Sequence, residues 1–408
     1  MTPRCRFCGE KLEKLFADLG VSPLANRYLT AEQLGDMEPF YPLRTYVCGG
    51  CLLVQLEEFE SPEAIFGDYA YFSSYSDTWL KHAERYCSAM VARLSLGATS
   101  QIVEIASNDG YLLQYFAARG LRVLGVEPAA NVAEAAIAKG IPTIRRFFGE
   151  SLARELVSQG LAADLLVGNN VLAHVPKLND FVEGLRQALK PDGVVTLEFP
   201  HLLRLIEECQ FDTIYHEHFS YLSLLTAERV FRAHGLRLFD VEELPTHGGS
   251  VRVYLCHEDS HTPQSTAVEQ LRTRERAAGL DEMTTYLAFS ERPKIVKREL
   301  LDVLIDVKRR GQTIVAYGAA AKGNTLLNYC GVGPDFIEYA VDRSPHKQGR
   351  FLPGTRLPIS SPERIRETRP DFLLVLPWNL KDEIVEQMKF IRDWGGRFII
   401  PIPRVDVC

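Results

Sequence analysis

The chain has 408 residues, of which 46% are hydrophobic, and it carries a formal net charge of −7 with an isoelectric point near 5.9. This length predicts two or three globular domains, and the acidic balance argues against nucleic acid as the main partner. Charges interrupt every apolar stretch before the roughly 18 residues that a membrane-spanning helix needs. The amino terminus lacks the apolar core of a signal peptide, and nine cysteines, an odd number, fit a reducing compartment better than a disulfide framework. We therefore expect a cytoplasmic monomer without a membrane partner.

Two cysteine pairs lie near the amino terminus. Cys5 and Cys8 form the first pair, Cys48 and Cys51 form the second, and glycines in or beside each pair allow a tight turn. Each pair can hold one edge of a tetrahedral Zn²⁺ ion. Because four thiolates fill every position of such a site, the predicted metal is structural. The alternative is a redox-active pair, but no neighbouring βαβ unit of the thioredoxin type supports it.

The pattern of apolar and turn residues predicts three domains. Residues 1–70 form a small unit that is too poor in apolar residues to fold firmly without metal. In residues 71–260 a helix precedes alternating strands and helices, which predicts a parallel Rossmann-like sheet extended by antiparallel strands. Residues 261–408 begin with a charged helical connector and continue as a second, smaller Rossmann-like series. The central elements are expected at helix 78–94, strand 101–106, helix 110–118, strand 121–126, helix 131–138, strand 142–145, helix 150–158, strand 163–168, helix 179–189, turn 190–193, and strands 193–199, 236–243 and 250–256.

The run from Ile102 to Gly110 is the most informative stretch of the chain. A short apolar strand ends there at a turn of small residues, and Glu127 closes the next strand. Small residues let backbone N–H groups approach a ligand, and an acid about 20 residues further on accepts hydrogen bonds from a ribose diol. Residues 106–108 stand where a dinucleotide site needs G-x-G-x-x-G, and the acids Glu104 and Asp109 suit a cationic ligand without phosphates. This pattern favours S-adenosylmethionine over NAD.

The densest polar cluster runs from Tyr215 to Tyr221, after the strand that ends at Pro200. It should lie at the carboxyl edge of the sheet, where open α/β sheets bind ligands. A histidine beside a carboxylate can act as a base near neutral pH. Core packing is the alternative for these residues, and metal binding by the two histidines and the glutamate is a minor one.

Asn169, Asn170 and His174 follow the fourth strand, where a methyltransferase would contact its donor. The apolar neighbours of His174 suit a buried structural histidine equally well. Phe148 and the phenylalanine before it either enclose an adenine ring or pack against a helix.

A phosphate-binding turn is predicted in the last domain. A strand, a small-residue turn and the start of a helix follow one another from Tyr317 to Thr325, and Lys322 lies in the turn. Backbone N–H groups and this lysine would hold a phosphate. The loop from Asp342 to Arg350 adds cations after the next strand, on the same edge of the sheet. A solvated charge run is the alternative for this loop.

Together, these motifs resemble those of the bacterial sugar C-methyltransferases, S-adenosylmethionine enzymes that methylate a carbon of nucleotide-linked keto-deoxysugars in antibiotic biosynthesis. The likeness runs through almost the whole chain. The cysteines resemble the family's zinc-binding domain, Glu104–Gly110 with Glu127 resembles its donor domain, and Gly318–Gly323 with the Asp342 loop resembles its C-terminal domain. The resemblance implies an α/β protein with a small zinc-binding N-terminal domain, a class I Rossmann-like methyltransferase domain and a Rossmann-like C-terminal domain that binds the nucleotide sugar.

The resemblance also implies roles for individual residues. It makes His218 the general base, with Tyr215 and Glu217 beside it and His174 as a further catalytic histidine. A catalytic tyrosine of the first domain fits Tyr69, with Tyr71 as the alternative. The residues expected to bind the donor are Glu104, Ala106, Asn108, Gly110, Glu127, Pro128, Phe148, Asn169 and Asn170. Those expected to bind the nucleotide sugar are Tyr317, Lys322, Asn324, Lys347 and Arg350.

A mechanism follows from the implied substrate. A C–H bond beside a ketone is acidic because the carbanion delocalises onto oxygen as an enolate. His218, with an ordinary pKa near 6.5 and a glutamate beside it, would remove the proton while a tyrosine or His174 donates to the oxyanion. The expected substrate is a dTDP-4-keto-deoxysugar, methylated at C-3 in preference to C-5. The alternatives are a methyltransferase acting on oxygen or nitrogen of another small molecule, a zinc-containing interaction protein, and a nicotinamide dehydrogenase, which the missing G-x-G-x-x-G disfavours.

Overall fold

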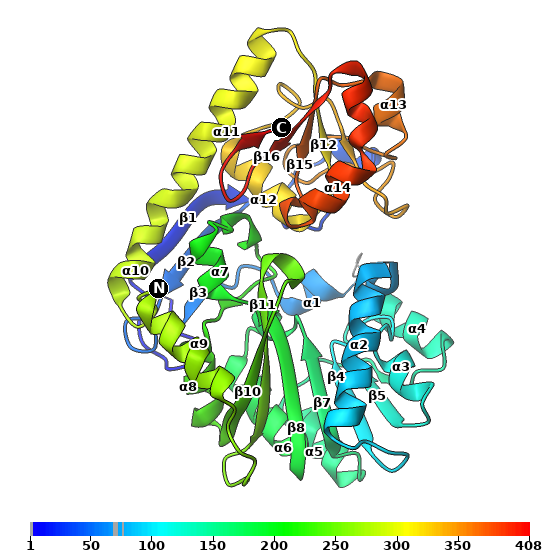
Figure 1. Ribbon diagram of the computed structural model, residues 1–408, viewed down its shortest axis with the longest axis vertical. Helices are drawn as coiled ribbons and strands as arrows, with labels where there is room; N and C mark the ends of the chain where they lie inside the picture. The colour runs from blue at the N-terminus through cyan, green and yellow to red at the C-terminus, as the bar shows by residue number, and fades with distance from the viewer. Residues whose placement is uncertain (1–2, 68–71, 76) are drawn as a thin grey trace.

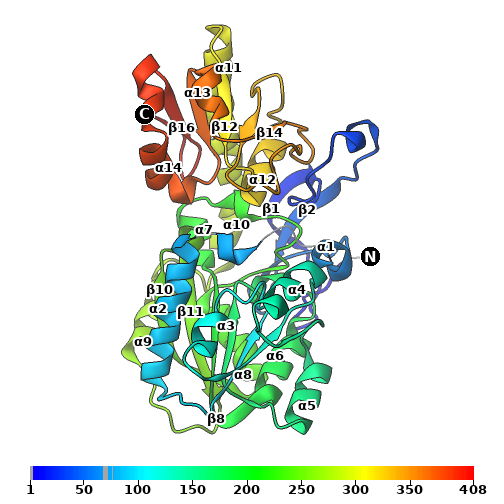
Figure 2. The ribbon, with the colours of Figure 1, turned by 90° about the vertical axis from the view of Figure 1, so that its right-hand side faces the viewer.

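The fold is an α/β arrangement built on three separate sheets (Figure 1). The computed structural model describes residues 3–67, 72–75 and 77–408, so Tyr69 and Tyr71 lie outside the described residues. The small N-terminal sheet lies at the junction between the central and C-terminal units (Figures 1 and 2). No helix among the described residues combines the length and the apolar character needed to cross a membrane.

The N-terminal sheet takes its fourth strand from the central part of the chain. Its order is β1-β2-β3-β9, all antiparallel, and Val54 of β3 pairs with Tyr221 of β9. The strand β9 directly follows the polar cluster of residues 215–218, so this pairing ties the cluster to the N-terminal domain. The elements are β1 (Lys14–Ser22), η1 (Glu32–Gly35), β2 (Tyr41–Val47), β3 (Val54–Leu56), α1 (Pro62–Phe66), η2 (Ser73–Tyr75) and β9 (Ser220–Tyr221).

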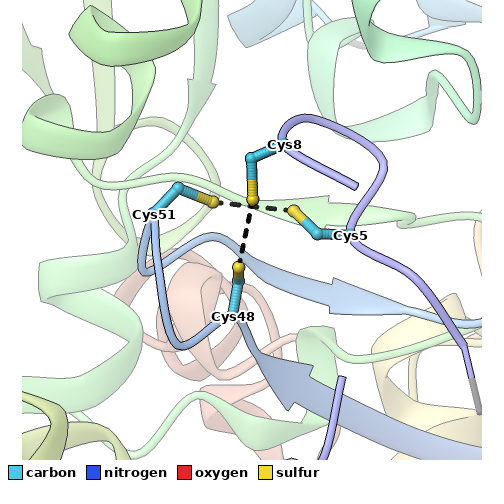
Figure 3. Close-up of side chains that lie close together, drawn as sticks. All are labelled: Cys5, Cys8, Cys48 and Cys51. Carbon is cyan, nitrogen blue, oxygen red and sulfur yellow. Dashed lines mark hydrogen bonds between the residues drawn. The ribbon is translucent and has the colours of Figure 1, made fainter. Parts of the chain in front are cut away.

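The four paired cysteines converge on one point beside this sheet (Figure 3). Their Sγ atoms all lie within 4.8 Å of one another, with 3.5 Å between Cys5 and Cys51 and 3.4 Å between Cys8 and Cys48. Zn–S bonds of about 2.3 Å in a tetrahedron put sulfur atoms roughly 3.8 Å apart. Gln55 Nε2 also donates to Cys5 Sγ at 3.2 Å, which suits a thiolate. The cluster therefore fits the predicted structural Zn²⁺ ion.

The central sheet has the order β10-β11-β8-β7-β4-β5-β6. Strands β4 to β8 are parallel, and β11 pairs antiparallel with both β8 and β10, so the predicted extension of a parallel sheet is confirmed. The elements are α2 (Asp77–Arg93), β4 (Gln101–Ile105), α3 (Leu113–Ala117), β5 (Arg122–Val126), α4 (Ala130–Ala138), β6 (Thr143–Ile144), α5 (Glu150–Ser158), β7 (Ala163–Asn169), η3 (Leu172–His174), α6 (Leu178–Ala188), β8 (Leu189–Pro200), α7 (Leu202–Glu207), η4 (Phe211–Thr213), α8 (Leu224–Ala233), β10 (Leu236–Leu244), η5 (Thr246–Gly248) and β11 (Ser250–His257).

Two local predictions in this domain were wrong. The helix expected from residue 110 begins at Leu113, because Gly110 is left-handed with φ of 77° and extends the turn. The turn expected at residues 190–193 lies inside β8, where the pairing register with β7 shifts between Ala163 and Leu165. An inserted stretch of this kind is accommodated by a bulge.

The C-terminal unit follows a helical connector, as expected. Its sheet has the order β14-β13-β12-β15-β16-β17 and is parallel except for β17. The long helix α11 (yellow in Figure 1) runs beside the N-terminal sheet and the C-terminal sheet. The elements are α9 (Thr266–Ala277), α10 (Met283–Ala288), η6 (Phe289–Glu291), α11 (Arg292–Arg309), β12 (Ile314–Tyr317), α12 (Ala321–Cys330), β13 (Ala340–Val341), β14 (Ile359–Ser360), α13 (Arg364–Thr368), β15 (Phe372–Val375), η7 (Trp378–Leu380), α14 (Lys381–Gln387), η8 (Lys389–Trp394), β16 (Arg397–Ile400) and β17 (Asp406–Val407).

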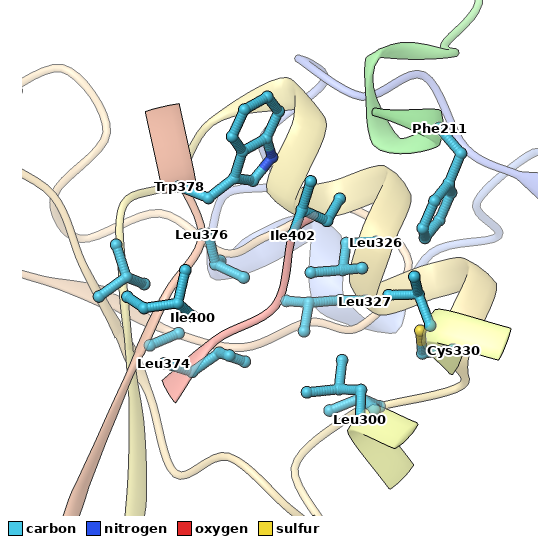
Figure 4. Packing of buried hydrophobic residues seen from close by; sticks show 14 of the residues in the cluster. Phe211, Leu300, Leu326, Leu327, Cys330, Leu374, Leu376, Trp378, Ile400 and Ile402 are labelled. Carbon is cyan, nitrogen blue, oxygen red and sulfur yellow. The ribbon is translucent and has the colours of Figure 1, made fainter. Parts of the chain in front are cut away.

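One hydrophobic core joins parts of all three units. It contains Phe16 of β1, Phe211 of the central unit and Leu326 of α12, and Figure 4 shows Phe211 packed beside α12. Phe16 stacks on Phe289 with ring centroids 4.4 Å apart. A buried Tyr28 hydroxyl also donates to the Ala319 carbonyl oxygen at 2.6 Å, which links the N-terminal unit to the turn after β12. The three units therefore pack as one body.

We expect Cys48→Ser to lower zinc content and thermal stability together, because metal affinity is part of the folding free energy of a small metal-bound unit. Elemental analysis should fall from about one zinc per chain, and the melting temperature should fall with it. Cys408→Ser is the matched control, since Cys408 is exposed and lies outside the cluster. Undamaged protein without zinc would contradict the prediction.

Candidate active site

A cavity of about 560 Å³ opens at the carboxyl ends of β4, β5 and β7. Residues from all three units line it, among them Asn26, Glu127 and Lys322. Its volume is in the range of small-molecule sites, and its place is the edge where open α/β sheets bind ligands.

The turn after β4 is held in a strained conformation by Glu127. Ala106 and Asn108 are both left-handed, with φ of 56° and 49°, which non-glycine residues rarely adopt. Glu127 compensates by accepting from the Asn108 N–H and the Ala129 N–H, each at 2.9 Å. Burial raises the pKa of Glu127, and these two N–H groups oppose the rise. The carboxylate faces the cavity with lone pairs left for further donors.

Seven of the nine residues predicted to bind the donor line the cavity: Ala106, Asn108, Glu127, Pro128, Phe148, Asn169 and Asn170. Glu104 does not, because it is fully buried within β4, where desolvation raises its pKa well above its usual value. Gly110 serves the turn instead, donating its N–H to the Ser107 carbonyl at 3.1 Å. The Asp109 carboxylate, which was expected to suit a cationic ligand, forms an ion pair with Lys139 Nζ at 3.0 Å.

Three predicted catalytic side chains meet on another wall of the cavity. The His218 ring lies 4.1 Å from that of Tyr215 and 4.7 Å from that of His174, measured between centroids. His218 Nδ1 is 2.8 Å from the Thr213 carbonyl oxygen. Because a carbonyl only accepts, Nδ1 carries the proton of the neutral ring, and Nε2 keeps its lone pair. Within the described part of the chain, Nε2 has no hydrogen-bond partner.

Burial keeps both histidines neutral. It lowers the pKa of His218 well below its usual value, and the positive charges that His174, His247 and Lys322 carry when protonated act in the same direction. Burial also lowers the pKa of His174 to about 4. The expectation of an ordinary His218 pKa near 6.5 is therefore wrong. A neutral imidazole is nevertheless the form that accepts a proton.

Glu217 does not pair with His218, contrary to the expectation from their adjacency. Its Oε1 accepts instead from Asn26 Nδ2 at 2.7 Å, and the side chain does not line the cavity. Burial raises the pKa of Glu217 to about 7. Glu217 is thus a partner of Asn26 rather than of the His218 ring.

Two of the five residues predicted to bind the nucleotide sugar, Lys322 and Lys347, line the cavity. Their Nζ atoms donate to Asn379 Oδ1 at 2.8 Å and to the Ala319 carbonyl at 2.7 Å. The other three lie elsewhere. Asn324 donates to the Ala25 carbonyl at 2.5 Å as a link between units, the Tyr317 hydroxyl faces Gln387 at 3.4 Å, and Arg350 is exposed outside the cavity lining.

The lining residues that the sequence analysis did not identify include Asn26, Tyr28, Trp79 and His247. The His247 ring packs edge-on to Trp79 and its Nε2 lies 3.0 Å from Asn170 Nδ2. Of these four, only His247 gave a usable signal in the sequence, because Gly248 and Gly249 follow it; in the structure its φ is left-handed at 56°. Nothing in the local pattern around Asn26, Tyr28 or Trp79 distinguishes them from packing residues.

Comparison with known proteins identifies the family. Over 399 residues the chain is 36% identical to the C-methyltransferase NovU of Streptomyces niveus, covering 98% of this chain and 95% of that protein. The chain belongs to the S-adenosylmethionine-dependent C-methyltransferases. Family models described as "Putative zinc binding domain", "Methyltransferase domain" and "C-methyltransferase C-terminal domain" match residues 5–66, 79–241 and 245–403. The predicted zinc and S-adenosylmethionine are confirmed at the level of this family.

Solved structures resemble about half of this C-methyltransferase. Magnesium protoporphyrin IX methyltransferase from Synechocystis PCC 6803 with bound SAH matches with a TM-score of 0.35 and 14% identity, over 48% of this chain and 91% of that one. The PH0226 protein of Pyrococcus horikoshii OT3 matches with a TM-score of 0.37 and 14% identity, over 49% and 99%. The family assignment does not depend on either.

We expect Glu127→Ala to weaken S-adenosylmethionine binding by at least about 1.5 kcal/mol, the scale of a lost hydrogen bond to a charged group. The loss has two sources, the ribose contact and the two N–H groups that hold the strained turn. Glu127→Gln separates them, because its single carbonyl oxygen keeps part of the acceptor set. Calorimetry should rank the donor affinities as wild type, Gln, Ala. An unchanged affinity in the alanine variant would show that the ribose binds elsewhere.

Proposed function

We propose that this C-methyltransferase methylates the carbon beside the ketone of a dTDP-4-keto-deoxysugar, at C-3 in preference to C-5, as a step of antibiotic deoxysugar biosynthesis. The observation that carries the proposal is the hydrogen bonding and protonation of the His218 ring. Its Nδ1 is fixed by the Thr213 carbonyl at 2.8 Å, which leaves Nε2 as the unprotonated nitrogen of a ring that lines the same cavity as the donor turn. A base that needs no metal suits proton removal from a carbon made acidic by a ketone.

The cavity wall supports an enolate mechanism. His218 Nε2 takes the proton, and the electron pair of the broken C–H bond moves onto the ketone oxygen. S-adenosylmethionine, when bound, supplies an electrophilic methyl group. The residues at the donor turn and those around His218 line one cavity, so binding there would hold the carbon and the methyl group close and oriented.

The start of α12 supports a diphosphate on the substrate. Ala320, Ala321 and Lys322 line the cavity, and no side chain of the described residues caps this end of the ten-residue helix. Uncapped N–H groups at a helix start favour an anion. Lys322 and Lys347 add positive charge on the same wall.

The proposal is tested by incubating the purified protein with S-adenosylmethionine and a panel of dTDP-4-keto-deoxysugars. Mass spectrometry should show a gain of one methyl group on the sugar, and deuterium exchange should locate the carbon at C-3. Oxygen and nitrogen acceptors of similar size serve as controls. Methylation of those acceptors but of none of the keto sugars would overturn the proposal.

We expect His218→Asn and His218→Ala to lower turnover by about 10²–10⁴-fold, the usual contribution of a general base, while donor affinity is retained. Exchange of the substrate α-proton with D₂O, where the wild type catalyses it without donor, should vanish in both variants. Tyr215→Phe and His174→Ala complete the comparison under saturating donor. Near-normal turnover in the His218 variants with loss in either of the others would transfer the role of base to that residue.

The pH profile should reflect the burial of His218. Because its pKa is lowered, the ring stays unprotonated as the pH falls through 6.5, so α-proton exchange should persist below that pH. His174→Ala should shift the acid limb of the profile to higher pH, since it admits solvent to the His218 ring and removes the positive charge that His174 acquires at low pH. An acid limb centred at or above 6.5 in the wild type would contradict the prediction.

A further inference from the structure

Asn26 belongs to the zinc-binding domain and lines the cavity, and among the described residues only one of the two hydrogens on its side-chain nitrogen is hydrogen-bonded. Its Nδ2 donates to Glu217 Oε1 at 2.7 Å, while its Oδ1 accepts from the Tyr28 hydroxyl at 3.3 Å. An amide nitrogen carries two hydrogens. The second has no hydrogen-bond partner among the described residues, although Asn26 lines the cavity.

The two neighbours fix which way the amide faces. If the amide were flipped, Oδ1 would stand 2.7 Å from a Glu217 oxygen, with no hydrogen between them when the acid is ionised. The single hydrogen of the Tyr28 hydroxyl is directed mainly to the Ala319 carbonyl at 2.6 Å, so its 3.3 Å contact with Asn26 Oδ1 is the weaker of the two. The donor nitrogen of Asn26 is therefore oriented in advance mainly by Glu217 of the central unit.

Asn26 and the proposed base line the same cavity. Glu217, which it contacts, immediately precedes His218 in the chain, and both Asn26 and His218 line the cavity. Tyr215 is a less suitable donor, because burial raises its pKa well above the usual value and so makes its hydroxyl a weaker acid. An amide N–H needs no proton transfer and stays a donor at every pH.

We propose that Asn26 is a catalytic residue that donates its second N–H to the ketone oxygen as the enolate forms. The assignment rests on the proposed function. In the step, the C–H bond breaks, its proton goes to His218 Nε2 and its electron pair delocalises onto the ketone oxygen, which accepts the hydrogen bond. The enolate then forms a C–C bond as the S–CH₃ bond of the donor breaks, and that pair of electrons stays on sulfur. The zinc-binding domain would thus supply part of the active site.

The test compares Asn26→Ala and Asn26→Asp with Arg27→Ala, whose exposed side chain lies on the same segment and outside the cavity lining. The probe is the keto sugar of the panel that the wild type converts fastest. Both Asn26 variants should lose about 10²–10³-fold in kcat and in donor-independent α-proton exchange, the usual effect of removing one oxyanion donor. Zinc content and S-adenosylmethionine affinity should stay at wild-type values in all three variants.

A further variant distinguishes a hydrogen bond from Asn26 to the ketone oxygen from a role of Asn26 that is limited to holding Glu217. Glu217→Gln keeps an oxygen that accepts from Asn26, so its loss of kcat should be smaller than that of Asn26→Ala. An equal or larger loss in Glu217→Gln, or an Asn26→Ala rate within threefold of wild type, would overturn the assignment while leaving the proposed function in place. A wild type that neither exchanges nor methylates any keto sugar of the panel would overturn both.

Discussion

The pairing of β9 with β3 is the constraint on which the active site depends. Buried backbone N–H and C=O groups must find partners, and β9 pairs with β3 of the N-terminal sheet, while the residues on either side of it bond to Ala173 and Leu202 of the central unit. The chain just before β9 contains Tyr215 and His218, so their position follows from a strand borrowed across a domain boundary. Zinc stabilises the sheet that receives this strand. The metal is therefore linked to the active site through the backbone hydrogen bonds of this sheet, without contacting the site itself.

Buried ionisable groups near the cavity are of two kinds, those that are ionised beside charged partners and those that stay neutral. Glu198 is completely buried, yet it stays ionised with a pKa of about 2, because His82 and Arg252 lie 3.0 and 2.8 Å from its Oε2. That ion pair network ties α2, which carries Trp79, to β8 and β11. His218 and His174 have no acid partner within the described ranges and remain neutral instead. Removing one partner from the first group would leave an unpaired buried charge, whereas the second group is poised to change charge during a reaction.

The features that sequence predicted well are local ones. The cysteine pairs, the alternation of strands and helices, and the small-residue turn followed by Glu127 each involve neighbours in the chain, and the structure brings them together as expected. Adjacency in the sequence gave a wrong prediction where the side chains of two successive residues point in different directions. Glu217 and His218 are consecutive, yet one faces Asn26 and the other the Thr213 carbonyl. Asn26 itself lies 191 positions from its partner, and no periodicity carries a contact of that length.

The cavity suits the proposed chemistry, because the net charge inside it would stay constant through the reaction. With donor bound, one positive charge lies on sulfur and the base is neutral. In the proposed reaction, proton removal would add opposite charges on the imidazolium and the enolate, and methyl transfer would leave a single positive charge on His218. Burial disfavours that imidazolium when it stands alone, so the ring takes a proton readily only when a negative oxygen forms beside it. The proposed Asn26 N–H donor would favour the same oxygen in a medium where charges interact strongly. The low pKa of His218 is therefore compatible with its role, since the environment penalises the isolated cation far more than the pair.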